Sequence, residues 1–205
     1  MATKYLTLPA SLRVKSFIPG MIDGLSQNRG PYSPAERRLE TGGEFWVAAL
    51  DLVPMEPEMG QQIQALSYRL MRADAALQLG PPSRAVKRGT TSDAALTLDG
   101  PAAAGATDID VAGLGAGRTL LAGSYITLDA KRLHQVVEDV TADGAGKATL
   151  VVLPRLRSGY SGGTFIRVKV ADLRSVWRLS ASPRLAYDAP VFSPVRLELY
   201  EAVEV

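Results

Sequence analysis

The chain has 205 residues, a length that fits one large domain or two small ones. Hydrophobic residues make up 46% and charged residues 21%, a composition typical of a globular chain and not of a disordered one. The 23 Lys and Arg residues nearly balance the 21 Asp and Glu residues, so the net charge of +2 gives no argument for nucleic-acid binding.

Two residue types limit the chemistry further. The chain has no cysteine, which excludes disulfides, thiolate metal sites and cysteine nucleophiles. His134 is the only histidine, so a Ser-His-Asp triad would have to include it and a site with two histidine ligands cannot form within one chain. Residues 1–19 lack the features of a signal peptide, and no stretch is apolar enough for a membrane helix, so we expect no export and no membrane.

In chain order, the first regular element that the pattern predicts is a buried strand at residues 43–53, where both faces are largely apolar. Residues 26–42, just before it, are rich in Gly, Pro, Ser, Asn and charge. This composition predicts a long loop.

A helix is predicted next, at residues 57–72. Its apolar residues are spaced by 4, 3 and 4 positions, which places them in one stripe: Met59, Ile63, Leu66 and Leu70. Pro57 suits the first helical turn, where its missing N–H is not needed. An amphipathic helix must pack on something, most simply a sheet. A short strand at residues 75–79 can follow it.

The composition changes after a basic connector at residues 83–92. Short β-type runs separated by Gly-rich turns then recur at a spacing of roughly ten residues, which predicts a small antiparallel barrel or sandwich. The runs are residues 94–98, 108–111, 119–128, 133–140 and 148–153. Between the last two, Asp143, Gly144, Ala145 and Gly146 predict a hairpin turn, since glycine readily takes a positive φ.

Strand patterns return at residues 165–170, 176–180 and 195–205, after a connector at residues 157–163. The chain is therefore predicted to be mainly β, as a β-sandwich or split barrel with one packed α-helix and an inserted small antiparallel barrel of OB or galectin type. The first module takes residues 1–85 and 164–205, and the inserted module takes residues 93–157.

No predicted feature forms a catalytic, cofactor or metal site. Glu138 shares a strand face with His134 but lies roughly 13 Å along it, too far to orient a catalytic base. We therefore expect His134 to be a surface or partly buried structural residue. The glycines of residues 113–117 precede a strand pattern and not a helix, which favours a turn or loop over a phosphate loop.

The remaining candidates are also best explained by structure. Asp108, Asp110 and Asp143 lack the spacing of a calcium loop or a glycosidase pair, so we expect solvated charges. Trp46 and Trp177 sit in apolar runs and should belong to the core. Tyr160, between glycines, is the one ring expected to be exposed. The chain is predicted not to be an enzyme.

Residues 43–70, reading GEFWVAALDLVPMEPEMGQQIQALSYRL, resemble tail-tip proteins of long-tailed phages. The segments Leu120 to Ile126, Glu138 to Leu150 and Leu153 to Arg157 are also similar to phage tail sequences. The resemblance extends over residues 43–180, and the distal tail protein family fits best.

This resemblance implies a structural virion protein of the tail tip, made in the host cytoplasm and needing no cofactor. It implies a ring of identical subunits, hexameric by analogy, that joins the tail tube protein to baseplate hub or tail-tip proteins. DNA would pass through the lumen without specific binding. Tail-tube and tail-terminator subunits share this fold and remain alternatives. So does a carbohydrate-binding β module at residues 93–157, although Tyr125 is the only aromatic ring there.

Overall fold

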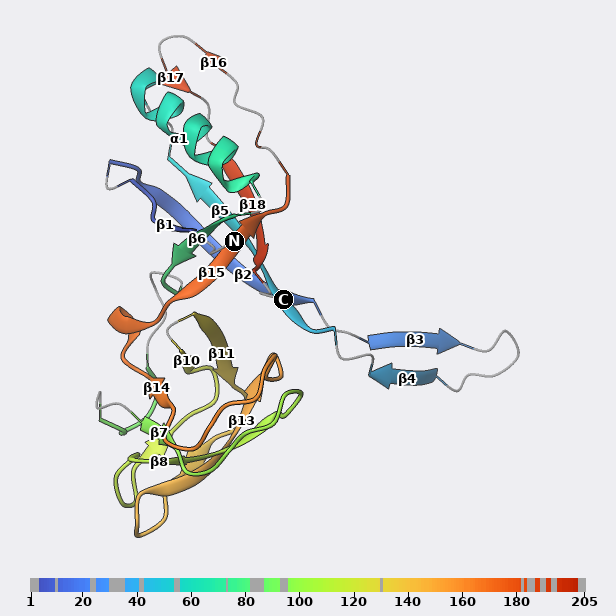
Figure 1. Cartoon of the computed structure of the whole chain (residues 1–205), viewed down its shortest axis with the longest axis vertical. Coiled ribbons are helices and arrows are strands. Elements are labelled where there is room, and N and C mark those ends of the chain that lie inside the picture. Colours follow the sequence, from blue (N-terminus) through green and yellow to red (C-terminus); the bar gives the residue numbers. More distant parts are fainter. Residues whose placement is uncertain are drawn as a thin grey trace.

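The structure is a computed structural model, and its described residues are mainly β with a single α-helix, which confirms the predicted fold class. They form a sheet covered by the helix, a closed barrel at the end of the molecule away from the helix, and a hairpin that extends away from both (Figure 1). The structure describes residues 4–9, 11–22, 25–29, 36–40, 43–53, 56–72, 74–81, 87–92, 96–129, 131–181, 183, 187–188, 191–192 and 195–202.

The sheet has six strands, in which β1 runs parallel to β6 and every other neighbouring pair is antiparallel. From one edge to the other they are β1 (Lys4–Leu6), β6 (Ala75–Leu79), β15 (Ser175–Leu179), β18 (Arg196–Glu201), β5 (Phe45–Leu52) and β2 (Val14–Ile22). The strand predicted at residues 43–53 is confirmed as β5, but its place as the first element is wrong, because β1 and the nine-residue β2 precede it. Pro19 interrupts the sequence pattern of β2 but is tolerated there, because an outer strand leaves one side of its backbone unpaired.

One face of this sheet is covered by α1 (Pro57–Leu70). Ile63, Leu66 and Leu70 of the predicted stripe are buried, and Pro57 occupies the first turn as expected. They pack with the inward residues of β5, which alternate regularly with half-buried ones along the strand. Each buried Leu or Ile stabilises the fold by about 1.5–3 kcal/mol, so this stripe holds the helix on the sheet.

The barrel is closed and all its strand pairs are antiparallel. Around the barrel the strands are β10 (Tyr125–Leu128), β11 (Arg132–Val136), β13 (Lys147–Leu153), β8 (Asp108–Ala112), β7 (Leu96–Leu98) and β14 (Phe165–Arg167). β14 pairs with β7 and β10 and so closes the barrel. The barrel therefore continues past residue 164, where the first module was expected to resume.

Two predicted strands are each divided in two. Residues 119–128 form β9 (Thr119–Leu120) and β10, and residues 133–140 contribute to β11 and β12 (Val140–Thr141). The first break is a turn at Gly123, which has a φ of 87° and donates its N–H to the carbonyl of Val136 at 2.8 Å. β9 and β12 then pair with each other beside the barrel.

The turn at Asp143 to Gly146 closes as glycine-rich turns do. The carboxylate of Asp143 accepts the N–H groups of Ala145 and Lys147, both at 2.8 Å, and Gly146 has a φ of 77°. The turn joins β12 to β13, and β13 pairs with β11, the strand before β12.

The predicted loop at residues 26–42 is wrong over its described part. β3 (Leu25–Arg29) and β4 (Glu36–Glu40) pair antiparallel, and Figure 1 shows this hairpin extending sideways from the body; the other residues of the expected loop, 30–35 and 41–42, lie outside the described ones. The polar composition favoured a loop, whereas cross-strand backbone pairing needs no apolar face. The remaining short elements are η1 (Val170–Asp172), β16 (Tyr187–Asp188) and β17 (Val191–Phe192).

Candidate functional site

His134 lies on β11 and is 1% exposed, so the expectation of a surface or partly buried histidine is wrong. Its Nδ1 lies 2.7 Å from the carbonyl oxygen of Pro154, and because a carbonyl only accepts, Nδ1 carries the proton. Burial, together with the positive charges of Arg132 and Arg157, lowers the pKa of His134 to about 4. The ring is therefore neutral at pH 7 and is enclosed within the fold.

The glycine run at residues 113–117 is a loop, as predicted. Gly113, Gly115 and Gly117 all have positive φ, and β9 begins at Thr119 without an intervening helix. A phosphate loop directs the N–H groups of a helix N-terminus at its ligand, and this loop has no such helix.

The three candidate carboxylates are exposed, as predicted. Asp110 accepts a hydrogen bond from the Thr149 hydroxyl at 2.7 Å, and Asp143 closes its own turn. Asp108 lies two positions before Asp110 on β8. Within the described parts of the chain, no group of three or more His, Asp or Glu residues could hold a metal ion.

Of the three aromatic residues discussed above, two are buried as predicted and one is buried against the prediction. Trp46 and Trp177 are buried, as predicted, at 5% and 0% exposed. Tyr160 is only 8% exposed, so its predicted exposure is wrong, and burial raises the pKa of its hydroxyl. Its backbone pairs with Ala102 at 2.8 and 2.9 Å, which holds the glycine-rich connector against the barrel.

The residues that the structure does bring together lie at the junction of the sheet and the barrel. Trp46 of β5 donates its indole N–H to the carbonyl of Leu133 on β11 at 2.7 Å. The ring of Tyr125, from β10, lies 6.1 Å from the Trp46 ring and is packed against the sheet's core. The sequence separation of 87 residues between Trp46 and Leu133 left no local signal for this contact.

Two carboxylates face three arginines at the same junction. Glu44, just before β5, accepts both the backbone N–H and the Nη2 of Arg155, each at 3.2 Å. Glu201, at the end of β18, is 6% exposed and accepts the backbone N–H of Trp46 at 3.3 Å. Burial raises the pKa of Glu201, while that hydrogen bond and the charges of Arg157 and Arg132 partly oppose the increase.

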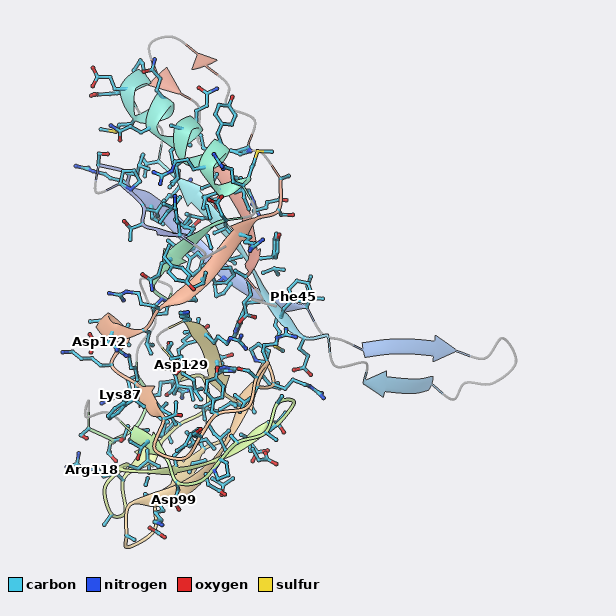
Figure 2. The ribbon with its side chains drawn as sticks, in the orientation of Figure 1. Phe45, Lys87, Asp99, Arg118, Asp129 and Asp172 are labelled. Carbon is cyan, nitrogen blue, oxygen red and sulfur yellow. The ribbon has the colours of Figure 1, made fainter. Side chains whose placement is uncertain are left out.

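The second feature that the structure reveals is an apolar groove over β2, β5 and β18, on the face of the sheet opposite α1. It encloses about 580 Å³. Three of its lining residues are notably exposed for apolar side chains: Ile18 at 57%, Ile22 at 44% and Tyr200 at 36%. Phe45 also lines it, at the root of the projecting hairpin (Figure 2). A contiguous exposed apolar surface of this kind marks an interaction site more often than chance.

In the described residues, no helix is both long and apolar enough to cross a membrane. No protein-family profile matches the sequence, and a search of curated proteins finds no match. The junction and the groove are therefore interpreted from their own chemistry.

Proposed function

We propose that the chain is a structural virion protein that forms a ring at the distal end of a phage tail and joins the tail tube to the baseplate or tail-tip hub. The observation that carries the proposal is the open groove beside the outer strand β2, in a sheet whose other face is covered. The sequence resemblance to distal tail proteins supplies the context. A ring subunit of this kind has no catalytic role.

The outer strands support self-association. β2 and β1 end the sheet, and neither pairs with a second strand among the described residues. Unpaired strand edges are ready partners for another chain. Because the two edges differ, contact between copies would be head-to-tail, and such contacts generate a ring when the rotation closes.

The hairpin of β3 and β4 supports the same conclusion. A two-stranded hairpin standing alone is at best marginally stable in water. This one extends away from the sheet and the barrel in Figure 1. A neighbouring subunit would provide a surface against which the hairpin packs.

The other partners follow from this placement. The ring would be a homo-oligomer, hexameric by analogy, with the tail tube protein on one side and hub proteins on the other. The small net charge of +2 suits a lumen through which DNA passes without specific binding. The protein would be made in the host cytoplasm and located in the virion. Tail-tube and tail-terminator subunits remain alternatives for the same reasons.

One observation favours a carbohydrate-binding module as a second candidate. Phe165, on β14 of the barrel, is 67% exposed and could stack on a sugar ring. Tyr125, in contrast, is partly buried at the junction. A single exposed ring offers less than the several rings that sugar stacking usually needs, so we place this candidate second.

Native mass spectrometry of the purified chain and immunogold labelling of phage particles test the proposal. We expect a closed oligomer, and label at the tail tip. Ile18→Lys, which puts a charge in the groove, should shift the chain towards monomer. Phe165→Lys is the matched control, because it also places a charge at an exposed apolar residue, 67% exposed against 57% for Ile18, but outside the groove. A chain that binds glycans but is absent from particles would contradict the proposal.

A further inference from the structure

The barrel and the sheet are joined by two chain connections, one from β6 to β7 and one from β14 to β15. Modules joined in this way are expected to move relative to each other unless their interface is extensive and well packed. The contacts between these two modules decide which case applies.

The first contact point is on β5, the second strand from one edge of the sheet. Trp46 is 5% exposed, and its indole N–H reaches the Leu133 carbonyl at 2.7 Å. A hydrogen bond is directional. An indole N–H that is buried without an acceptor is unfavourable, because it has lost its bond to water and has gained none in the protein. Sliding of the barrel on the sheet would break this hydrogen bond.

The second contact point is the pair of carboxylates. Glu44 holds Arg155 through two bonds of 3.2 Å, one to the guanidinium and one to the backbone, which fixes both position and orientation. Glu201 brings a further carboxylate from β18 towards Arg132 and Arg157, whose charges act on its pKa. Separating the modules would leave the buried Glu201 and the partly buried Glu44 and Arg155 without their counter-charges.

The third contact point lies at the opposite edge of the sheet. The ammonium of Lys131, in the turn between β10 and β11, lies 5.1 Å from the centre of the Tyr5 ring on β1. Figure 2 shows Asp129, in the same turn, on the side of the barrel nearest the sheet. The Thr127 hydroxyl also donates to the carbonyl of Arg174, just before β15, at 3.3 Å.

We infer that the junction locks the barrel and the sheet into one rigid body, with Trp46 as the residue that positions the barrel. The contacts lie at β1, at β15 and at β18 with β5, so they span the width of the sheet. A rotation about either chain connection must break at least one of them. All of these contacts lie within one chain, so the rigidity of the junction does not depend on the proposed tail-tip role.

Pulsed electron–electron double resonance between two spin labels can measure the distance between the modules directly. The chain has no cysteine, so spin labels at Ala65→Cys on α1 and Ala145→Cys on the barrel have no background. Both positions are exposed. We expect a single narrow distance distribution in this labelled chain. A broad or multimodal distribution would overturn the inference.

The same labels then report on the junction variants. Trp46→Phe combined with Glu44→Gln should broaden the distribution while circular dichroism stays unchanged. The matched control is Trp177→Phe, which also removes a buried indole N–H bond, but one made to Ser175 within β15 at 2.6 Å. The control should keep the narrow distribution. If the double variant does not fold, Glu44→Gln alone replaces it. An unchanged distribution in the folded junction variant would overturn the inference.

Discussion

His134 is an ionisable residue on β11 that the fold buries almost completely. Lys131, Arg132 and Gln135 surround it, a polar context that predicts exposure. In the fold its ring is 1% exposed and donates a hydrogen bond to the carbonyl of Pro154, 20 residues further along the chain. The burial of a side chain depends on what packs over it, and that is contributed by distant residues.

The lowered pKa of His134 leads to a pH dependence of stability. The pKa is about 4 in the folded chain and near 6.5 in the unfolded chain, so the folded state favours the neutral ring. The contribution of His134 to the free energy of unfolding is present above pH 6.5 and is lost as the pH falls towards 4. The full loss is about 3 kcal/mol. Urea unfolding at a series of pH values measures it.

His134→Gln is the control for this measurement, because its side chain does not titrate. The raised pKa of Glu201 works in the opposite direction, since its protonated form is favoured in the fold. That contribution is common to both proteins and cancels in their difference. Parallel pH profiles for the wild type and the variant would show that His134 does not carry the dependence.

At the scale of elements, local patterns predicted well where one stripe or one turn decides the outcome. The helix at residues 57–70 follows from its apolar spacing and from Pro57, and the turn at residues 143–146 follows from its Asp and Gly residues. The patterns failed at β2, which was not predicted, and at β14, whose pattern does not say which sheet it joins.

The turn at residues 143–146 offers an internal comparison of two glycines. Gly146 has a φ of 77°, and a Cβ there would lie 3.0 Å from the backbone nitrogen of Gly115. Gly146→Ala should therefore lower the free energy of unfolding by about 1–3 kcal/mol, since the positive φ and the close contact both disfavour a side chain. Chemical denaturation followed by circular dichroism measures this change.

Gly144→Ala in the same turn is the matched control. A Cβ at Gly144 meets nothing within 4 Å, and its φ lies outside the left-handed region. We expect a change of less than about 0.5 kcal/mol there. Equal effects at the two positions would mean that backbone conformation does not explain the role of Gly146.

For the whole molecule, the junction implies that the two modules unfold together. Hydrogen exchange of barrel and sheet amides should report the same free energy for the slowest opening in both modules, as a single cooperative unit requires. In Arg155→Gln, which removes the ion pair with Glu44, the free energies of the slowest opening in the two modules should differ. Different free energies in the wild type would show two independently folding units.

The amino-acid sequence by itself determined the mainly β class, the helix at residues 57–70, most strand positions and the lack of cysteine chemistry, because these depend on composition and on neighbours along the chain. The burial of His134 and Tyr160, the place of β14 in the barrel and the open groove beside β2 were settled only in three dimensions. Each depends on contacts between residues far apart in sequence, as Trp46 and Leu133 are. Such contacts leave no periodic trace in either segment, so the sequence alone could not place them.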